Sequence, residues 1–394
     1  MRIALLFDHF GPYHLARLRA AGQVADMVAV EFYTRSGDYA WEVADRKELK
    51  VTTVSAGLRE AVTSGQFEAL LANHLDQVAP DVVVIPGWAS RESLAALNWC
   101  LDRRVPAVLM SESCSHDEVR VGWKEWVKRR IVGCCPAALV GGSLHQGYLE
   151  ELGLKREQIS LGYDAVDNGY FAEGARPGRE KAGRDRHGLF LVSARFIEKK
   201  NLPRLIEAYA RYRQAVRTDG GSRDPWSLVL LGDGELRPAL EQQVRELGLV
   251  PFVSMPGFLQ YEELPGYYAR ASAFIHASTT EQWGLVVNEA MASGLPVLVS
   301  NRCGCAEDLV EEGINGFTFD PEDVQGMAAV MGRMTALPEE KLRQMGCESE
   351  QIIADWGPAR FAEGMRQAAA RALSTGGRKP SLVDRVLLKI LMSR

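Results

Sequence analysis

Two carboxylates eight positions apart stand on either side of a glycine that is followed by an apolar run. Glu281 precedes Gly284, and Glu289 follows it within the segment EQWGLVVNEAMASGLPV. A predicted strand ends just before this segment, so Gly284 falls where a loop turns into a helix. The first N–H groups of a helix and its dipole favour an anion such as phosphate. The spacing therefore predicts a phosphate site between two carboxylates, each able to hold the hydroxyl groups of one sugar.

Strand-length apolar runs alternate with helix-length amphipathic segments along the chain. This pattern predicts an α/β fold with parallel sheets covered by helices. We expect strands at residues 3–7, 27–32, 82–85, 107–110, 137–140 and 159–161, and again at 189–193, 228–231, 252–255, 273–276 and 296–300. Ligands of such sheets bind beyond the carboxyl ends of the strands, so we look for function in the loops that follow them.

A break in this alternation predicts the domain boundary. Residues 171–188 are rich in Gly, Pro and mixed charge and carry no apolar period, which is typical of a linker. We expect one domain over 1–170, the linker over 171–188, a second domain over 189–373, and a basic amphipathic tail over 374–394. A chain of 394 residues is also about twice what one core usually organises.

Composition excludes several classes of protein. Fifty-one acidic and 46 basic side chains give a net charge of −5, which provides no field to gather nucleic acid. Seven cysteines without paired C-x2-C spacing argue against a disulfide framework or a zinc site and favour a reducing cytoplasm. The first apolar run is too short for a signal peptide, and no stretch approaches the roughly 20 apolar residues of a membrane span.

Other motifs accompany the 281–297 segment at ordered spacing: ARFIEKKN at 194–201, LGDG at 231–234, PGFL at 256–259 and CGCAE at 303–307. With the E-x7-E pattern, they resemble the family 4 glycosyltransferases, which are retaining enzymes of the GT-B architecture. The resemblance covers most of the second half and only the outline of the first, where the acceptor binds. It implies two Rossmann-like domains facing across a cleft and transfer of a sugar from a UDP- or GDP-sugar to an acceptor hydroxyl.

The resemblance also implies roles for charged residues. Arg195 and Lys200 match the basic pair that grips the donor diphosphate, although Lys199 could replace Lys200 if the register slips by one. Glu281 matches the carboxylate that contacts the transferred sugar, and Glu289 the one that holds the ribose hydroxyls. Cations at the leaving diphosphate stabilise its developing charge, so the resemblance implies catalysis without a metal or cofactor.

Backbone groups complete the implied donor site. Gly257 and Phe258 match the loop that frames the base, and Gly284, Leu285 and Val286 offer backbone N–H groups to phosphate.

The first half adds three candidates. Gly11 lies in the loop after the first strand, which the family keeps close to donor and acceptor, while Pro12 beside it is also a common helix start. The family commonly has a histidine after the fifth strand that bonds the donor sugar. By register Glu112 takes that position here, and His116 follows four residues later, so either of them could contact the sugar.

Two segments of the chain combine basic residues with large apolar residues. Residues 120–130 combine five basic residues with two tryptophans, and the tail from Arg378 places five basic residues around an apolar series. Such mixtures suit anionic lipid headgroups and predict peripheral contact with the inner face of the cell membrane. The alternative is an amphipathic helix packed on the protein itself.

Several side chains near the motifs have plainer readings. His276, at the end of an apolar strand, is expected to be a packed or capping residue, and Cys303 and Cys305 small loop residues.

Three other functions remain alternatives. A nucleotide-sugar 2-epimerase of similar architecture would need no acceptor, and a non-catalytic two-lobed sugar-binding protein would release no nucleoside diphosphate. A nicotinamide-dependent dehydrogenase is disfavoured because the loop after the first strand lacks G-x-G-x-x-G.

Overall fold

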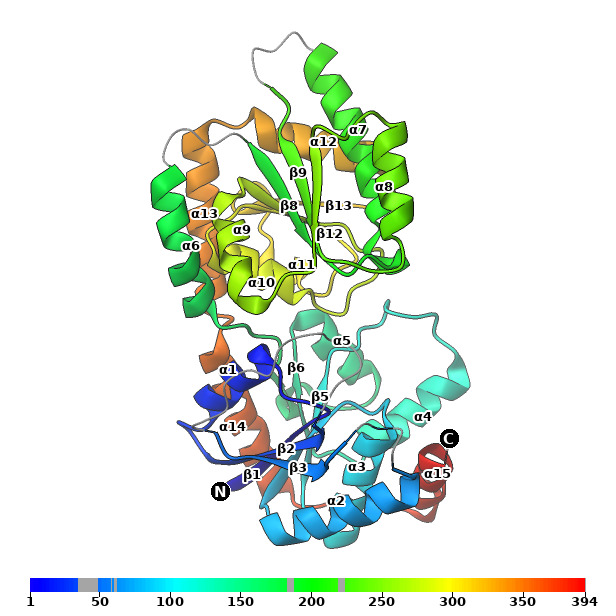
Figure 1. Ribbon diagram of the computed structural model, residues 1–394. Coiled ribbons are helices and arrows are strands. Elements are labelled where there is room, and N and C mark those ends of the chain that lie inside the picture. The colour runs from blue at the N-terminus through cyan, green and yellow to red at the C-terminus, as the bar shows by residue number, and fades with distance from the viewer. Residues whose placement is uncertain (35–48, 58, 60–61, 183–187, 219–223, 394) are drawn as a thin grey trace. The chain divides into compact units, whose positions relative to one another are not determined.

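The computed structural model describes residues 1–34, 49–57, 59, 62–182, 188–218 and 224–393 (Figure 1). These residues form two units, Met1–Val166 with Gly357–Arg394, and Asp167–Trp356. Each unit is a parallel sheet covered by helices, which confirms the predicted α/β class.

The first unit contains a seven-stranded sheet in the order β3-β2-β1-β4-β5-β6-β7, with every pair parallel. Its strands are β1 (Arg2–Phe7), β2 (Asp26–Tyr33), β3 (Val51–Ser55), β4 (Val82–Pro86), β5 (Ala107–Ser111), β6 (Ala137–Val140) and β7 (Ile159–Leu161). Its helices are α1 (Pro12–Ala21), α2 (Ser64–Val78), α3 (Arg91–Arg103), α4 (Gly122–Val132), α5 (Ser143–Glu151), α14 (Pro358–Thr375) and α15 (Leu382–Met392).

The second unit contains a six-stranded parallel sheet in the order β10-β9-β8-β11-β12-β13. Its strands are β8 (Leu189–Ser193), β9 (Ser227–Leu231), β10 (Val253–Gly257), β11 (Ala273–His276), β12 (Val297–Ser300) and β13 (Gly316–Phe319). Its helices are α6 (Asn168–Ala182), α7 (Leu202–Thr218), α8 (Arg237–Glu246), α9 (Leu264–Arg270), α10 (Leu285–Ala292), α11 (Ala306–Leu309), α12 (Val324–Ala336) and α13 (Glu339–Ala354), with the 3-10 turn η3 (Glu198–Lys200) before α7.

All eleven predicted strands are present, with ends that differ by at most two residues. The sequence pattern missed β3 and β13. β3 is only partly buried and contains two threonines, and β13 is four residues long and begins with glycine, so neither stands out as an apolar run.

The predicted linker over 171–188 is wrong for the residues that the structure describes. Residues 168–182 form helix α6, and residues 183–187 lie outside the described part of the chain. The glycines that suggested a linker serve close packing: a Cβ on Gly174 would lie 2.7 Å from Pro265, and one on Gly178 would lie 2.7 Å from Ala269, both on α9. The absence of these side chains lets α6 approach α9.

The boundary expected at 373 is also wrong, because α14 belongs to the first unit. Phe361, Met365 and Ala369 on α14 are fully buried in the core under β1 and β4, and in Figure 1 this helix runs beside strands more than 200 residues away in sequence. A Cβ on Gly364 would lie 2.3 Å from the carbonyl oxygen of Leu161 in β7. The chain therefore returns to complete the first core, a step that no local pattern signals.

Part of the tail forms an amphipathic helix packed on the protein, which was the alternative to membrane contact. α15 spans Leu382–Met392 and packs against α3 and α4 of the first unit. Within the described residues, no helix has both the length and the apolar character that crossing a bilayer requires.

One substitution made in two helices tests the placement of α14. Gly364→Ala should destabilise the protein by about 1–3 kcal/mol, because the new methyl group would overlap the β7 backbone. Gly332→Ala in α12 meets nothing within 4 Å and should stabilise by about 0.5–1 kcal/mol through helix propensity alone. Urea unfolding measures both, and equal effects at the two positions would contradict the packing of α14 on β7.

Candidate functional site

In the second sheet β8 and β11 are neighbours, and the strand order reverses between them. From β8 the chain continues to β9 and β10 toward one edge of the sheet, and from β11 it continues to β12 and β13 toward the other. Open α/β sheets bind ligands outside the carboxyl ends of strands at such a point. β8 leads into η3 with Lys199 and Lys200, and β11 leads into the loop that carries Glu281. The backbone N–H of Thr279 donates to the carbonyl oxygen of Lys199 at 2.9 Å and ties the two loops together.

Four side chains converge on the Glu281 carboxylate. Lys200 forms an ion pair and hydrogen bond with its Oε2. The same oxygen accepts from Ser278 Oγ at 3.1 Å and lies 3.3 Å from His276 Nε2, and Lys199 Nζ is 3.7 Å from Oε1. The structure thus brings together the predicted residues Lys200 and Glu281, which are 81 positions apart.

These contacts keep Glu281 ionised. Burial opposes the charge, but the hydrogen bond with His276 and the charges of Lys200 and Lys199 outweigh it and hold the pKa of Glu281 well below its usual range. Burial lowers the pKa of His276, so its ring is neutral at pH 7. One carboxylate between two ammonium groups leaves the cluster with a positive excess, which suits an anionic ligand.

Sequence analysis missed part of this cluster. His276 is buried, as expected of a packed residue, but its ring also bonds Glu281, and Ser278 was not singled out at all. Alternate residues of an extended segment project to the same side, so positions 276 and 278 share the side that faces Glu281. That alternation, continued past the end of β11, is the signal that could have found them.

The Gly284 turn sets the start of α10. Gly284 is the N-cap residue with φ +108° and ψ +62°, a left-handed conformation that favours glycine. An added Cβ would lie 3.5 Å from Cys305 Sγ and from the His276 ring. Leu285 and Val286 form the first turn of α10, where backbone N–H groups have no partner inside the helix.

The loop after β12 is hydrogen-bonded to the loop that carries Glu281. The N–H of Gly304 donates to the carbonyl oxygen of Glu281 at 3.0 Å, and that of Cys305 donates to Trp283 at 3.2 Å. Cys303 and Cys305 are fully buried in this loop, consistent with the expectation of small structural residues.

Glu289 is fully buried on α10 and accepts a hydrogen bond of 2.6 Å from the Tyr268 hydroxyl on α9. The Tyr268 hydroxyl thus fixes one oxygen of this carboxylate. Its predicted role toward a ribose stays a prediction.

Arg195 is exposed in the loop after β8, on the same edge of the sheet as Lys200. The glycine turn after β9 holds this loop: a Cβ on Gly232 would lie 1.9 Å from the carbonyl oxygen of Ala194, and the N–H of Phe196 donates to Asp233 at 2.8 Å. The LGDG motif is therefore glycine-rich because two backbones meet there.

Gly257 and Phe258 also lie at this edge. Gly257 ends β10 with φ +102°, and its carbonyl oxygen accepts the N–H of Gly232 at 2.9 Å. Phe258 is 42% exposed, so its ring is available to a ligand. Their predicted contact with a base stays a prediction.

The three first-half candidates lie at the carboxyl edge of the first sheet. Gly11 is the N-cap of α1, and its N–H donates to His14 Nδ1 at 3.2 Å. Burial and the charge of Arg17 lower the pKa of His14 to about 3, so its ring is a neutral acceptor. Glu112 is half-buried just after β5, and His116 is exposed in the same loop.

A buried carboxyl beside Glu112 escaped sequence analysis. Asp164, three residues after β7, is 1% exposed, and Arg17 Nη2 lies 3.9 Å from its Oδ1. Burial and the charge of Glu112 raise the pKa of Asp164 well above its usual value, against the opposing charge of Arg17. Burial and the charge of Glu112 therefore favour the protonated form of Asp164.

The raised pKa of Asp164 predicts a pH dependence of stability. Between the unfolded pKa of about 4 and the higher folded pKa, the unfolded chain releases a proton that the folded chain keeps, so stability falls as pH rises, by at most about 1.4 kcal/mol per unit. Asp164→Asn removes this effect and should gain stability relative to wild type as pH rises above about 4 in urea unfolding. Asp26→Asn, at an exposed carboxylate, is the matched control. A constant difference between Asp164→Asn and wild type would show that folding does not raise the pKa of Asp164.

A second substitution tests the Gly284 turn. Gly284→Ala should cost about 1–2 kcal/mol for a left-handed residue with a Cβ, and should weaken binding of inorganic diphosphate at least tenfold by displacing the first turn of α10. Gly248→Ala, at φ +65° with open space around it, carries similar strain away from the site. Calorimetric titration should show weaker binding only for Gly284→Ala; equal losses would place the anion elsewhere.

Comparison with known proteins points to one family. Residues 178–351 match the family model "Glycosyl transferases group 1". The alpha-monoglucosyldiacylglycerol synthase of Acholeplasma laidlawii is 27% identical over 155 residues, which are 39% of this chain and 37% of the relative. The sulfoquinovosyl transferase SQD2 of Arabidopsis thaliana is 40% identical over 142 residues, 34% of this chain and 26% of the relative. The chain therefore spans less than half the length of these relatives.

Solved structures share the fold over nearly the whole chain. Alr3699/HepE of Anabaena, in complex with UDP and glucose, superposes with a TM-score of 0.72 at 19% identity and covers 94% of this chain and 99% of its own. Sucrose-phosphate synthase of Thermosynechococcus elongatus gives 0.73 at 20% identity over 95% and 99%.

Proposed function

We propose, from the match of residues 178–351 to the group 1 glycosyltransferase family model and from the GT-B fold, that this chain transfers a sugar from a nucleotide-sugar donor to an acceptor hydroxyl. The observation that carries this proposal is the cluster at the end of β8 and β11. Lys199, Lys200 and Glu281 meet there beside the start of α10. Cations and helix N–H groups suit a diphosphate, and an ionised carboxylate suits sugar hydroxyls.

The donor phosphates compete with Glu281 for Lys200. In the donor-free chain Lys200 is paired with Glu281, and a diphosphate offers it more negative charge. When Lys200 moves to the phosphate, Ser278 and His276 still hold the carboxylate, which then accepts hydrogen bonds from the sugar. Arg195 adds a second cation to the diphosphate.

The reaction proceeds with retention at the anomeric carbon and without a metal. The bond between the anomeric carbon and the phosphate oxygen breaks, and the acceptor oxygen bonds that carbon on the same face. The leaving phosphate oxygen takes the acceptor proton. Lys200, Arg195 and the N–H groups of Leu285 and Val286 stabilise its charge, and one such donor is worth about 100- to 1000-fold in rate.

The donor is a UDP- or GDP-sugar, and the acceptor a sugar or lipid-linked glycan in surface glycan, polysaccharide or glycolipid assembly. A structural neighbour has been solved with UDP and glucose, and one relative is named as a glucosyldiacylglycerol synthase. We place this activity in the cytoplasm, with residues 120–130 and 378–394 in contact with the inner face of the cell membrane.

Two neighbouring lysines provide a test. Lys200→Ala should lower kcat/KM for nucleoside diphosphate release about 100- to 1000-fold, because it removes the cation closest to Glu281. Lys199→Ala removes an equal charge that is farther from the carboxylate, at 3.7 Å, and should cost less than tenfold. The measurement uses a panel of UDP-, GDP- and ADP-sugars with and without candidate acceptors.

Three outcomes would contradict the proposal. Wild-type turnover by a folded Lys200→Ala variant removes the site assignment. A larger loss for Lys199→Ala would assign to Lys199 the role proposed for Lys200. Donor consumption that needs no acceptor favours an epimerase.

A further inference from the structure

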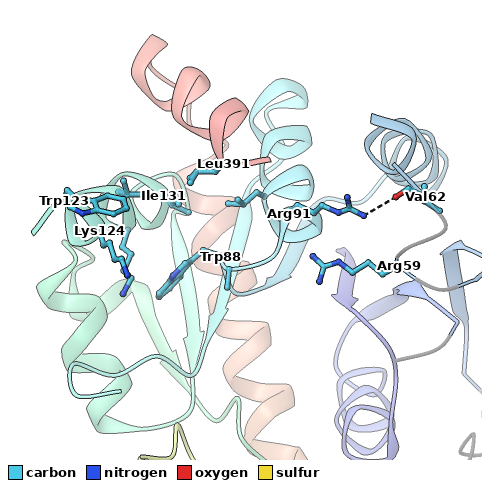
Figure 2. A pocket seen from close by; sticks show the side chains of 12 residues that line it. Arg59, Val62, Trp88, Arg91, Trp123, Lys124, Ile131 and Leu391 are labelled. Carbon is cyan, nitrogen blue, oxygen red and sulfur yellow. Dashed lines mark hydrogen bonds between the residues drawn. The ribbon is translucent and has the colours of Figure 1, made fainter. Parts of the chain in front are cut away.

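A groove of about 660 Å³ lies in the first unit between the start of α3, α4 and the end of α15 (Figure 2). Its floor is apolar, with Trp88, Ile131 and Leu391 among the residues that line it. Arg59 and Arg91 stand on one side and Lys124 on the other, as Figure 2 shows. Among the described residues, four cationic and no acidic side chains line the groove. An apolar floor with a cationic rim fits an anionic amphiphile.

The arginines on one side keep a net positive charge. Both Arg59 and Arg91 are ion-paired at 2.9 Å with the same carboxylate, Glu92, which is buried behind them at 1% exposure. Arg91 also donates to the carbonyl oxygen of Val62, so its guanidinium is held in place at the rim. Two cations sharing one buried anion present one unbalanced charge to the groove.

The lysines on the opposite side differ in availability. Lys128 is paired with Glu118 and Glu125. Lys124 is exposed, and in the described part of the chain it forms no ion pair or hydrogen bond. Lys124 can therefore meet an anion at the mouth of the groove.

α15 is apolar on two sides. Its inner side carries the buried residues Leu388 and Met392, and Asp384 there is paired with Arg130 of α4 at 2.5 Å. Its outer side carries exposed apolar residues with fractions of 49–78%: Leu382, Val383, Val386 and Ile390. Packing on the protein explains the inner side only.

The same surface exposes two tryptophans and gathers positive charge. On α4, Trp123 is 59% and Trp126 is 51% exposed, and Trp123 also lines the groove. Residues 120–130 and 378–394 contain ten basic and two acidic side chains, while the whole chain carries a net charge of −5. Exposed tryptophans with basic residues are typical of surfaces that meet anionic lipid headgroups.

Resting on the membrane contact in the proposed function, we propose that the bilayer that α4 and α15 meet is anionic and that the groove takes one anionic phospholipid from it. The lipid phosphate meets Arg59, Arg91 and Lys124, and its acyl chains lie along the apolar floor toward Leu391. The outer residues of α15 enter the headgroup region. This site goes beyond sugar transfer, because it uses no residue of the cluster around Glu281.

Vesicle flotation tests the docking surface with the full chain. Wild type should bind vesicles of phosphatidylcholine with 30% phosphatidylglycerol at least tenfold better than vesicles of phosphatidylcholine alone. Val386→Asp with Ile390→Asp should lower this binding at least tenfold, since both carboxylates would enter the bilayer. Val250→Asp, at a position 59% exposed in the second unit, should change nothing.

Two results would overturn the docking surface. One is equal binding of wild type to both kinds of vesicle. The other is a change in oligomeric state, measured by light scattering, that accounts for the whole effect of the double variant, because the outer side of α15 would then be a protein interface.

The groove is tested with dihexanoyl phosphatidylglycerol below its micelle concentration. Calorimetric titration should show saturable binding to one site. Ala89→Trp, which fills the groove from an exposed lining position, should weaken it at least tenfold, and Lys124→Glu should do so by reversing the rim charge. Wild-type affinity in both variants, or equally tight binding of inorganic phosphate alone, would overturn the lipid site.

A parallel assay separates this inference from the proposed function. Release of nucleoside diphosphate from the donor in the presence of a water-soluble acceptor should be unchanged in Ala89→Trp and in the α15 double variant. Lipid binding without any transferase activity would contradict the proposed function and support the lipid site. Transferase activity without lipid binding would contradict the lipid site and support the proposed function.

Discussion

The second unit is organised around an ionised carboxylate that is almost closed off from water. A buried charge costs several kcal/mol unless hydrogen bonds and opposite charges compensate it. Glu281 receives that compensation from two strand ends at once, with His276 and Ser278 following β11 and Lys199 and Lys200 following β8. The order of the sheet makes β8 and β11 neighbours, so the topology itself brings the charges together.

Glycines allow the backbones around this cluster to meet. Gly284 turns the chain into α10 in a conformation that other residues rarely adopt, and Gly232 lets the turn after β9 touch the loop that carries Arg195. A side chain at Gly232 would push the two loops apart, and one at Gly284 would strain the turn that starts α10. The same principle acts at Gly174 and Gly178, where α6 meets α9.

The first unit shows a different use of buried charge. Asp164 lies 3.9 Å from Arg17, too far for a hydrogen bond, and burial with the charge of Glu112 raises its pKa. Glu92 is also buried, but two arginines hold it ionised. The two arginines and Glu92 together have one net positive charge, which lies at the groove. The pKa of a buried carboxyl therefore shifts up or down according to how closely its cations approach.

Local sequence patterns were sufficient for the eleven strands and for the start of α10 at Gly284, because the alternation of apolar residues and the start of a helix depend on neighbours in the chain. The glycine-rich stretch over 171–182 and the helix α14 could not be placed this way. Both depend on a partner surface, α9 for one and the first sheet for the other, that is distant in sequence. Lys200 and Glu281 were named from a motif. Their contact across 81 residues, the lowered pKa of His276 and the raised pKa of Asp164 arise only when folding excludes water and brings separate segments within a few ångströms.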